Sequence, residues 1–336
     1  MTSTTSIEIE GAADTSLRLT GTHHVSTLSA HIGRTHDFYT RALGLRPVIR
    51  TVNQDAPSMY HLFFGDGAGT PGSDITVFDM PGAAREHRGN NSIARTTFRV
   101  SGDAALRHWA ERLSTLGVPH TGIAERDGRH VLDFEDVVGT QLSLVDDGGV
   151  GSGVAWDESP VPAAFQIRGL GYVILTVPTL EPTDRFLTEA LGLRHHHVYE
   201  LAGAEGWFTH VYEAAEGGVH AEVHVTVRND LPQSRYGSGG VHHVALRVPE
   251  ERSMSAWVAR LNAAGYRNSG IVDRHYFTSL YVREPNGVLF ELATDEPGFE
   301  VDGPMDGERL SLPPFLEPHR AEIEAGLRPI DAGASD

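Results

Sequence analysis

Four segments of the chain share one order of hydrophobic and polar positions. Each opens with a β-branched, strand-like run; in the fourth, Val244, Leu246 and Val248 alternate onto one face. A helical segment ending at a glycine follows, and shorter strand-like runs come after it. The expected helices cover 31–43, 104–116, 183–191 and 254–264, and the glycines are Gly44, Gly117, Gly192 and Gly265. The pattern predicts an α+β protein of four βαβββ modules, whose curled mixed sheets form cups with a helix on the convex side.

The second half of the chain repeats the first. The segment Phe38–Arg46 returns as Phe186–Arg194, which is 148 residues later, and Gly139 returns as Gly287 at the same offset. We therefore predict two tandem-duplicated halves, with an unrelated α+β arrangement of chance similarity as the alternative. The expected divisions are a flexible tail over 1–16, an N-terminal half over 17–147, a linker over 148–167, a C-terminal half over 168–296 and an extension over 297–336.

Composition narrows the classes of partner. The 336 residues carry a formal net charge of −18, which disfavours nucleic acid and anionic membrane surfaces. No run of eighteen apolar residues and no apolar segment near Met1 is present, so we predict no membrane span and a cytoplasmic location. The sequence leaves the oligomeric state open, a homo-oligomer included. The chain has no cysteine, so histidine, aspartate and glutamate are its remaining strong metal ligands.

Three of these residues are expected to converge. His24 and His243 each end a histidine pair at the start of a strand-like run, and Glu291 lies inside a third apolar run. Alternation turns the neighbouring apolar residues towards the helix, so His243 and Glu291 face the concave side of the sheet, and His24 falls in register with that side. Two imidazoles and one carboxylate form the facial triad of oxygen-using metal enzymes, which leaves coordination positions open.

The duplication predicts which modules share a cup. The equivalents of His24, His243 and Glu291 at the offset of 148 are Tyr172, Arg95 and Ser143, which cannot complete such a triad. Because one ion must contact all three ligands, modules one and four have to share a cup, and modules two and three line a metal-free one. Glu222 and His224 alternate on one face of module three and imitate a ligand pair. Module two offers no obvious partner for them, so we predict no second metal.

Several motifs, taken in their order, resemble one known family. They are Thr22–Val25, Phe38–Tyr39, Leu43–Arg46, His61–Asp66, Gly69–Ser73, Gly240–Ala245, Asp273–Phe277, Tyr281–Asp295 and Leu312–Glu317. With these motifs the chain resembles the vicinal oxygen chelate superfamily from Gly21 to its C-terminal tail. Within that superfamily it is similar to the ring-cleaving extradiol dioxygenases that act on hydroquinones.

The resemblance implies a cofactor, two substrates and a set of working residues. Fe(II), or Mn(II) as the alternative, would be held by His24, His243 and Glu291, and a small aromatic diol and O2 would be the substrates. Arg274 and Tyr281 match the family's arginine and tyrosine, which bind the substrate and stabilise developing negative charge.

The resemblance also gives roles to three residues beside the ligands. His23 and His242 match acid–base or hydrogen-bonding residues, whereas strict alternation points them away from the metal, so a structural role that holds the strand against its neighbour is an equal alternative. Ser26 shares the concave face with His24 and is expected to reach the substrate at a position where the family has threonine.

Two other functional classes fit the same scaffold. A glyoxalase-like isomerase or lyase would use a divalent ion as a Lewis acid without oxygen. A metal-free protein would instead bind an aromatic compound or an antibiotic in the cup. The concave placement of Glu291 disfavours this second class, because a buried carboxylate without a partner is costly.

Overall fold

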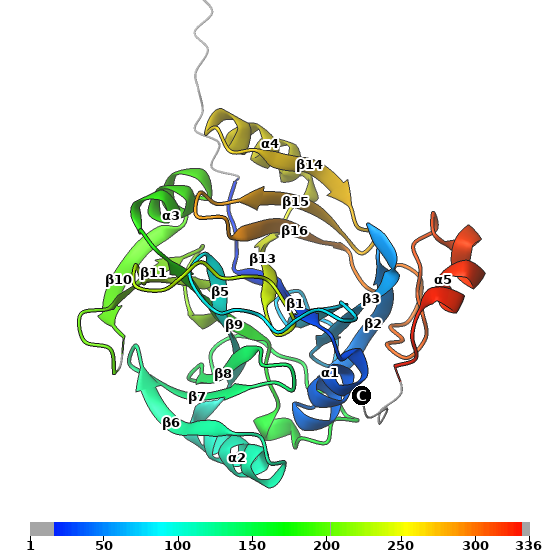
Figure 1. Ribbon diagram of the computed structural model, residues 1–336, viewed down its shortest axis with the longest axis horizontal. Helices are drawn as coiled ribbons and strands as arrows, with labels where there is room; N and C mark the ends of the chain where they lie inside the picture. The colour runs from blue at the N-terminus through cyan, green and yellow to red at the C-terminus, as the bar shows by residue number, and fades with distance from the viewer. Residues whose placement is uncertain (1–16, 202, 331–336) are drawn as a thin grey trace, which may run out of the picture.

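The computed structural model describes residues 17–201 and 203–330, so the predicted tail over 1–16 and the last six residues of the extension lie outside the described residues. Its strands form two eight-stranded mixed sheets. The first has the order β14-β15-β16-β13-β1-β4-β3-β2, and the second has the order β10-β11-β12-β9-β5-β8-β7-β6. Figure 1 shows the module helices α1 to α4 at the periphery of the molecule and the strands between them.

Each module has the predicted order of one strand, one helix and three strands. The first contains β1 (Thr22–Ser29), α1 (Ile32–Asp37), the π-helical turn η1 (Phe38–Ala42), β2 (Arg46–Asn53), β3 (Ala56–Gly65) and β4 (Asp74–Asp79). The second contains β5 (Ser92–Val100), α2 (Gly102–Thr115), β6 (His120–Arg126), β7 (Arg129–Glu135) and β8 (Gln141–Asp146). The short 3-10 helix η2 (Ala163–Phe165) precedes the third module.

The C-terminal modules repeat this order. The third contains β9 (Leu170–Val177), α3 (Glu181–Arg185), the π-helical turn η3 (Phe186–Ala190), β10 (Arg194–Glu200), β11 (Phe208–Glu213), the 3-10 helix η4 (Val219–Ala221) and β12 (Glu222–Val227). The fourth contains β13 (Val241–Val248), the 3-10 helix η5 (Glu251–Ser253), α4 (Met254–Ala263), β14 (Asn268–Asp273), β15 (Phe277–Arg283) and β16 (Leu289–Pro297). The 3-10 helix η6 (Glu317–His319) and α5 (Arg320–Gly326) follow.

Modules pair across the sequence, not with their neighbours in it. Antiparallel pairing of β1 with β13 joins modules one and four, and antiparallel pairing of β5 with β9 joins modules two and three. This is the pairing that the distribution of ligands predicts. The fold class, with four βαβββ modules in curled mixed sheets, is confirmed.

The helix ends and the buried faces also agree with the sequence pattern. Gly44, Gly117, Gly192 and Gly265 have φ between +69° and +83°, the left-handed conformation that ends a helix. The predicted helices over 31–43 and 183–191 each end in a π-helical turn instead of continuing as α-helix. The alternating apolar residues of the strands join the helices in the main core: Val25, Val244, Leu246, Phe290, Leu292, Trp257 and Leu261.

The C-terminal extension covers an edge strand. Ser311 donates its backbone N–H to the carbonyl of Arg50 on β2 at 2.8 Å. Leu312, Leu316 and Ile323 pack with Val52 of β2 in a separate apolar cluster. Figure 1 shows α5 beside β2 and β3. Among the described residues, no helix is both long and apolar enough to cross a bilayer.

Candidate metal centre

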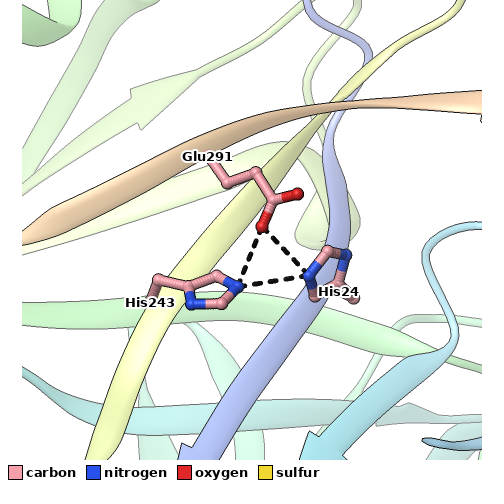
Figure 2. A group of neighbouring side chains, drawn as sticks. All are labelled: His24, His243 and Glu291. Atoms are coloured by element: carbon pink, nitrogen blue, oxygen red, sulfur yellow. Dashed lines mark hydrogen bonds and ion pairs between the residues drawn. The ribbon is translucent and has the colours of Figure 1, made fainter. Parts of the chain in front are cut away.

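The side chains of the three predicted ligands point towards one another from strands β1, β13 and β16, as Figure 2 shows. The Nε2 atoms of His24 and His243 are 3.3 Å apart. Glu291 Oε2 lies 3.3 Å from Nε2 of His24 and 2.9 Å from Nε2 of His243. All three side chains are buried.

Strand register explains this convergence. His24 of β1 pairs with Ala245 of β13, and Ala245 pairs with Glu291 of β16, so one row crosses three strands. Ala245 is the central residue of the row, and its methyl group leaves room for the flanking side chains to approach each other. His243 lies two residues before Ala245 on the same face. Ala245 of β13 therefore lies between His24 of β1 and Glu291 of β16, which are far apart in the sequence.

The geometry fits a bound cation. Two ligands each about 2.1 Å from an ion and at right angles are separated by about 3 Å, which matches the three distances. Glu291 Oε2 is a buried oxygen without a hydrogen-bond partner among the described residues. The other oxygen of Glu291 accepts a hydrogen bond from Ser279 Oγ at 2.5 Å, which fixes the carboxylate plane. The inward-facing oxygen thus lacks a partner that a metal ion would provide.

The charge states of Glu291 and His243 also suit the binding of a metal ion. Burial by itself raises the pKa of Glu291, but the neighbouring His24 and His243 outweigh it and hold that pKa well below its usual range. Burial lowers the pKa of His243. A carboxylate and neutral imidazoles are the forms that bind metals.

His23 and His242 contact the ligands from behind. Nδ1 of His23 is 2.9 Å from Nδ1 of His24, and Nδ1 of His242 is 2.7 Å from Nδ1 of His243. Burial lowers the pKa of each of these outer histidines to about 3, so both are neutral at physiological pH. His242 also lines the cavity in front of the ligands, whereas His23 packs against Phe277 with ring centroids 5.3 Å apart.

The triad opens into a cavity of about 540 Å³. Arg274 and Tyr281 line it beside His24 and His243. Arg274 donates from Nε to the Tyr281 hydroxyl at 3.1 Å and from Nη2 to Asp55 at 3.0 Å, and its carbonyl accepts a hydrogen bond from Gln54. Burial raises the pKa of the Tyr281 phenol, which keeps its proton available. A guanidinium and a phenol therefore lie at one wall of the cavity.

The structure corrects the prediction for Ser26 and adds His61 to the cavity wall. Ser26 is fully buried, and its hydroxyl is bonded to Thr76 Oγ1 at 2.7 Å. Thr76 Oγ1 is in turn 2.8 Å from Nε2 of His61, and it is His61 that lines the cavity. The sequence analysis gave His61 no role. Its place on the alternating concave face of β3, two residues before Phe63, was the available signal.

A second cluster lies in the cup of modules two and three. Asp127, Glu222 and His224 offer ligand atoms within 4.8 Å of one another, so module two does supply a partner and the reason given from the sequence was wrong. Both oxygens of Glu222 accept hydrogen bonds from Arg129, at 2.7 and 2.8 Å. Nε2 of His224 is 2.9 Å from Glu222, and its Nδ1 is 3.1 Å from the Tyr199 hydroxyl. Both ring nitrogens of His224 thus contact protein groups. The Arg129 guanidinium already supplies the positive charge that a metal ion would bring to Glu222.

Comparisons with known proteins agree with this architecture. The family model described as "Glyoxalase/Bleomycin resistance protein/Dioxygenase superfamily" matches residues 169–292. A Bacillus subtilis (strain 168) protein named "Putative ring-cleaving dioxygenase MhqA" is 48% identical over 318 residues, which cover 94% of this chain and 100% of that protein. The "Chlorohydroquinone/hydroquinone 1,2-dioxygenase" of Sphingobium indicum is 29% identical over 314 residues, covering 91% of this chain and 95% of that protein.

One solved structure is similar along nearly the whole chain. The crystal structure titled "putative dioxygenase from Bacillus subtilis subsp. subtilis str. 168" superposes with a TM-score of 0.85 at 34% sequence identity. The match covers 94% of this chain and 99% of that one.

Proposed function

This chain belongs to the glyoxalase/bleomycin resistance protein/dioxygenase superfamily and is a ring-cleaving dioxygenase, and on that basis we propose that it opens a hydroquinone or related dihydroxylated aromatic ring. We further propose that Fe(II) is its metal and that His24, His243 and Glu291 hold it. The observation that carries the proposal is the buried oxygen of Glu291, which faces two imidazole nitrogens at the floor of the cavity. The chain was expected to resemble this superfamily, and that prediction is confirmed.

The bound ion would supply open coordination positions at which a diol and dioxygen can lie side by side. The protein's own groups would orient the diol. Arg274 places a fixed positive charge at the cavity wall, where it stabilises a substrate oxygen that has lost its proton. The Tyr281 hydroxyl, polarised by the Arg274 guanidinium at 3.1 Å, would donate a hydrogen bond to an oxygen that becomes negative during the reaction.

His23 and His242 would act through the ligands. If His24 and His243 bind the metal through Nε2, the Nδ1 atom of each carries a proton. That N–H donates a hydrogen bond to Nδ1 of His23 or His242, respectively. This hydrogen bond fixes the ring orientation and makes the ligand more basic. His242 also lines the cavity, so it can contact the substrate, whereas His23 is a positioning residue. Ser26 would act through Thr76 and His61 and not by direct contact.

Oxygen uptake by the reconstituted protein tests the proposal. Protein loaded anaerobically with Fe(II) is mixed with hydroquinone and then with oxygenated buffer, and consumption of one O2 per ring-opened product is expected. Parallel samples loaded with Mn(II) and with Zn(II) separate a requirement for Fe(II) from a need for any divalent ion. Turnover of a glyoxalase-type substrate without oxygen, or tight binding of aromatic compounds by protein that takes up no metal, would replace the proposal with one of the two other classes.

A further inference from the structure

Two histidines of the third module face each other across neighbouring strands of the second sheet. Nε2 of His195 on β10 is 3.3 Å from Nδ1 of His210 on β11, and the two ring centroids are 5.5 Å apart. His195 is exposed and His210 is half-buried. β10 is an edge strand of its sheet, so an ion from solution can reach this pair of nitrogens.

A β-bulge explains why these two side chains meet. His195 pairs with Tyr212 and Val198 pairs with His210, and His196 is the extra residue between these two pairs. Tyr212 belongs to the main core under the helices. His210 lies two residues before Tyr212, and His195 lies directly opposite it, so both histidines share the helix-covered face of the sheet.

The other two histidines of the run point away from this pair. Nε2 of His197 is 2.6 Å from Asp127, in the cup of modules two and three. Nδ1 of His196 is 3.9 Å from Glu213. Of the three consecutive histidines, His195 alone is therefore directed at His210, and His196 provides a neighbouring histidine for a matched control.

The spacing of the two nitrogens fits a tetrahedral Zn(II) ion. Zn(II) binds imidazole nitrogen at about 2.0–2.1 Å, and two such ligands at the tetrahedral angle are separated by about 3.3 Å. The observed separation is the same, and it is long for an N–H hydrogen bond, which usually spans about 2.7–3.2 Å. Burial, and then the neighbouring His195, lower the pKa of His210, so its imidazole is in the neutral form that binds metals.

A carboxylate on the same face supplies negative charge. Tyr212 donates its hydroxyl to Oδ1 of Asp184 on α3 at 2.6 Å, and the Tyr212 ring lies 5.1 Å from the ring of His195. The charge of Asp184 acts on His210 as well, since it opposes the lowering of the His210 pKa. A cation between the two histidines would thus be attracted by a fixed acid from the adjoining helix.

We propose that His195 and His210 form a second metal site, which binds Zn(II) through Nε2 and Nδ1, with water at the two remaining tetrahedral positions and Asp184 as the nearby countercharge. Imidazole suits Zn(II), which it binds more tightly than Fe(II), so iron loaded at the triad does not fill this site. The ion joins β10 to β11 and thereby holds an edge strand of the second sheet in place. This site does not depend on the proposed function.

Counting bound zinc in matched variants tests the proposal. Metal-free protein is dialysed to equilibrium against Zn(II), and two ions per chain are expected, one at the triad and one at the pair. His195→Gln and His210→Gln should each weaken binding of one ion at least as much as the roughly 10–100-fold that loss of a ligand's hydrogen-bonding partner costs. His196→Gln should keep both ions, and the double variant His24→Gln with His243→Gln should keep the ion at the pair.

Hydrogen exchange locates the ion on the sheet. Zn(II) should slow exchange of the backbone amides of β10 and β11 in the unaltered protein and in His196→Gln, because a bound ion opposes fraying of the edge strand. It should not slow them in His195→Gln. His195 is exposed, so this variant is expected to fold even if His210→Gln does not.

The outcomes separate this site from the triad. A second zinc ion that survives both His195→Gln and His210→Gln would overturn the site, as would a count of zero in the triad double variant or unchanged exchange of β10 and β11 in the unaltered protein. If the unaltered protein binds one ion that His195→Gln removes and the triad double variant retains, the site at His195 and His210 stands, and the proposed metal centre at the triad is overturned.

Discussion

Replacing Glu222 by glutamine tests whether an ion pair or a metal ion stabilises the buried cluster in the cup of modules two and three. Glu222 is 2% exposed and receives two hydrogen bonds from Arg129 and one contact from His224. Burial by itself raises the pKa of Glu222, but His224 and Arg129 outweigh it and lower that pKa to about 2. Glu222→Gln removes the charge and leaves the Arg129 guanidinium with only its longer contact to Asp127 Oδ2, at 3.5 Å.

The expected loss of stability follows from this pKa. A shift from 4.5 to about 2 corresponds to roughly 3 kcal/mol of stabilisation, since one pKa unit is worth about 1.4 kcal/mol. Removing one partner of a buried ion pair costs a similar roughly 3–5 kcal/mol. Because the folded-state pKa is depressed, the stabilisation is complete above the unfolded pKa near 4.5 and is lost as pH falls from there towards 2.

Urea unfolding at several pH values measures the effect. At pH 7 the free energy of unfolding should be about 3 kcal/mol lower in Glu222→Gln than in the unaltered protein, and the difference should shrink as pH falls below about 4.5. Glu216→Gln, at an exposed residue of the neighbouring turn, is the matched control. Metal analysis of Fe(II)-loaded samples should give one ion per chain in all three proteins. A loss below about 1 kcal/mol at pH 7, or a fall from two ions to one in the variant, would refute the reasoning.

Three further predictions concern the metal centre. Arg274→Ala should lower kcat/KM for hydroquinone by roughly 10²–10³-fold without loss of iron, with Arg252→Ala as an exposed control; lost iron would contradict the assigned role. His23→Ala and His242→Ala should each weaken Fe(II) binding about 10–100-fold in a chelator competition, and only His242→Ala should also raise KM; equal KM effects would contradict the distinction drawn from the cavity lining. Ser279→Ala removes the hydrogen bond to Glu291 and should weaken Fe(II) binding by roughly tenfold or more, since a hydrogen bond to a charged group is worth about 1.5–3 kcal/mol; unchanged affinity would show that the carboxylate is held by other contacts.

Features that depend on local periodicity could be predicted from the sequence. Alternation placed His243 and Glu291 on the concave face because their apolar neighbours must pack under the helices. The absence of ligands at Tyr172, Arg95 and Ser143 was enough to predict that modules one and four join, as β1 and β13 do.

Contacts between distant turns could not be predicted in this way. Asp127 lies next to a glycine in the turn between β6 and β7, and its approach to Glu222 and His224 depends on how two modules curl together. Alternation could place His61 on a face, but its contact with Thr76 depends on the register between β3 and β4, which no local pattern sets.

The antiparallel pairing of β1 with β13 has a consequence for synthesis of the protein. His24 and His243 are 219 positions apart, and Glu291 emerges from the ribosome later still. A nascent or truncated chain ending before residue 291 can fold local hairpins, but it cannot bring His24, His243 and Glu291 together. Loading of the proposed ion would therefore mark a chain that has been translated past residue 291, and products interrupted earlier would lack the proposed centre.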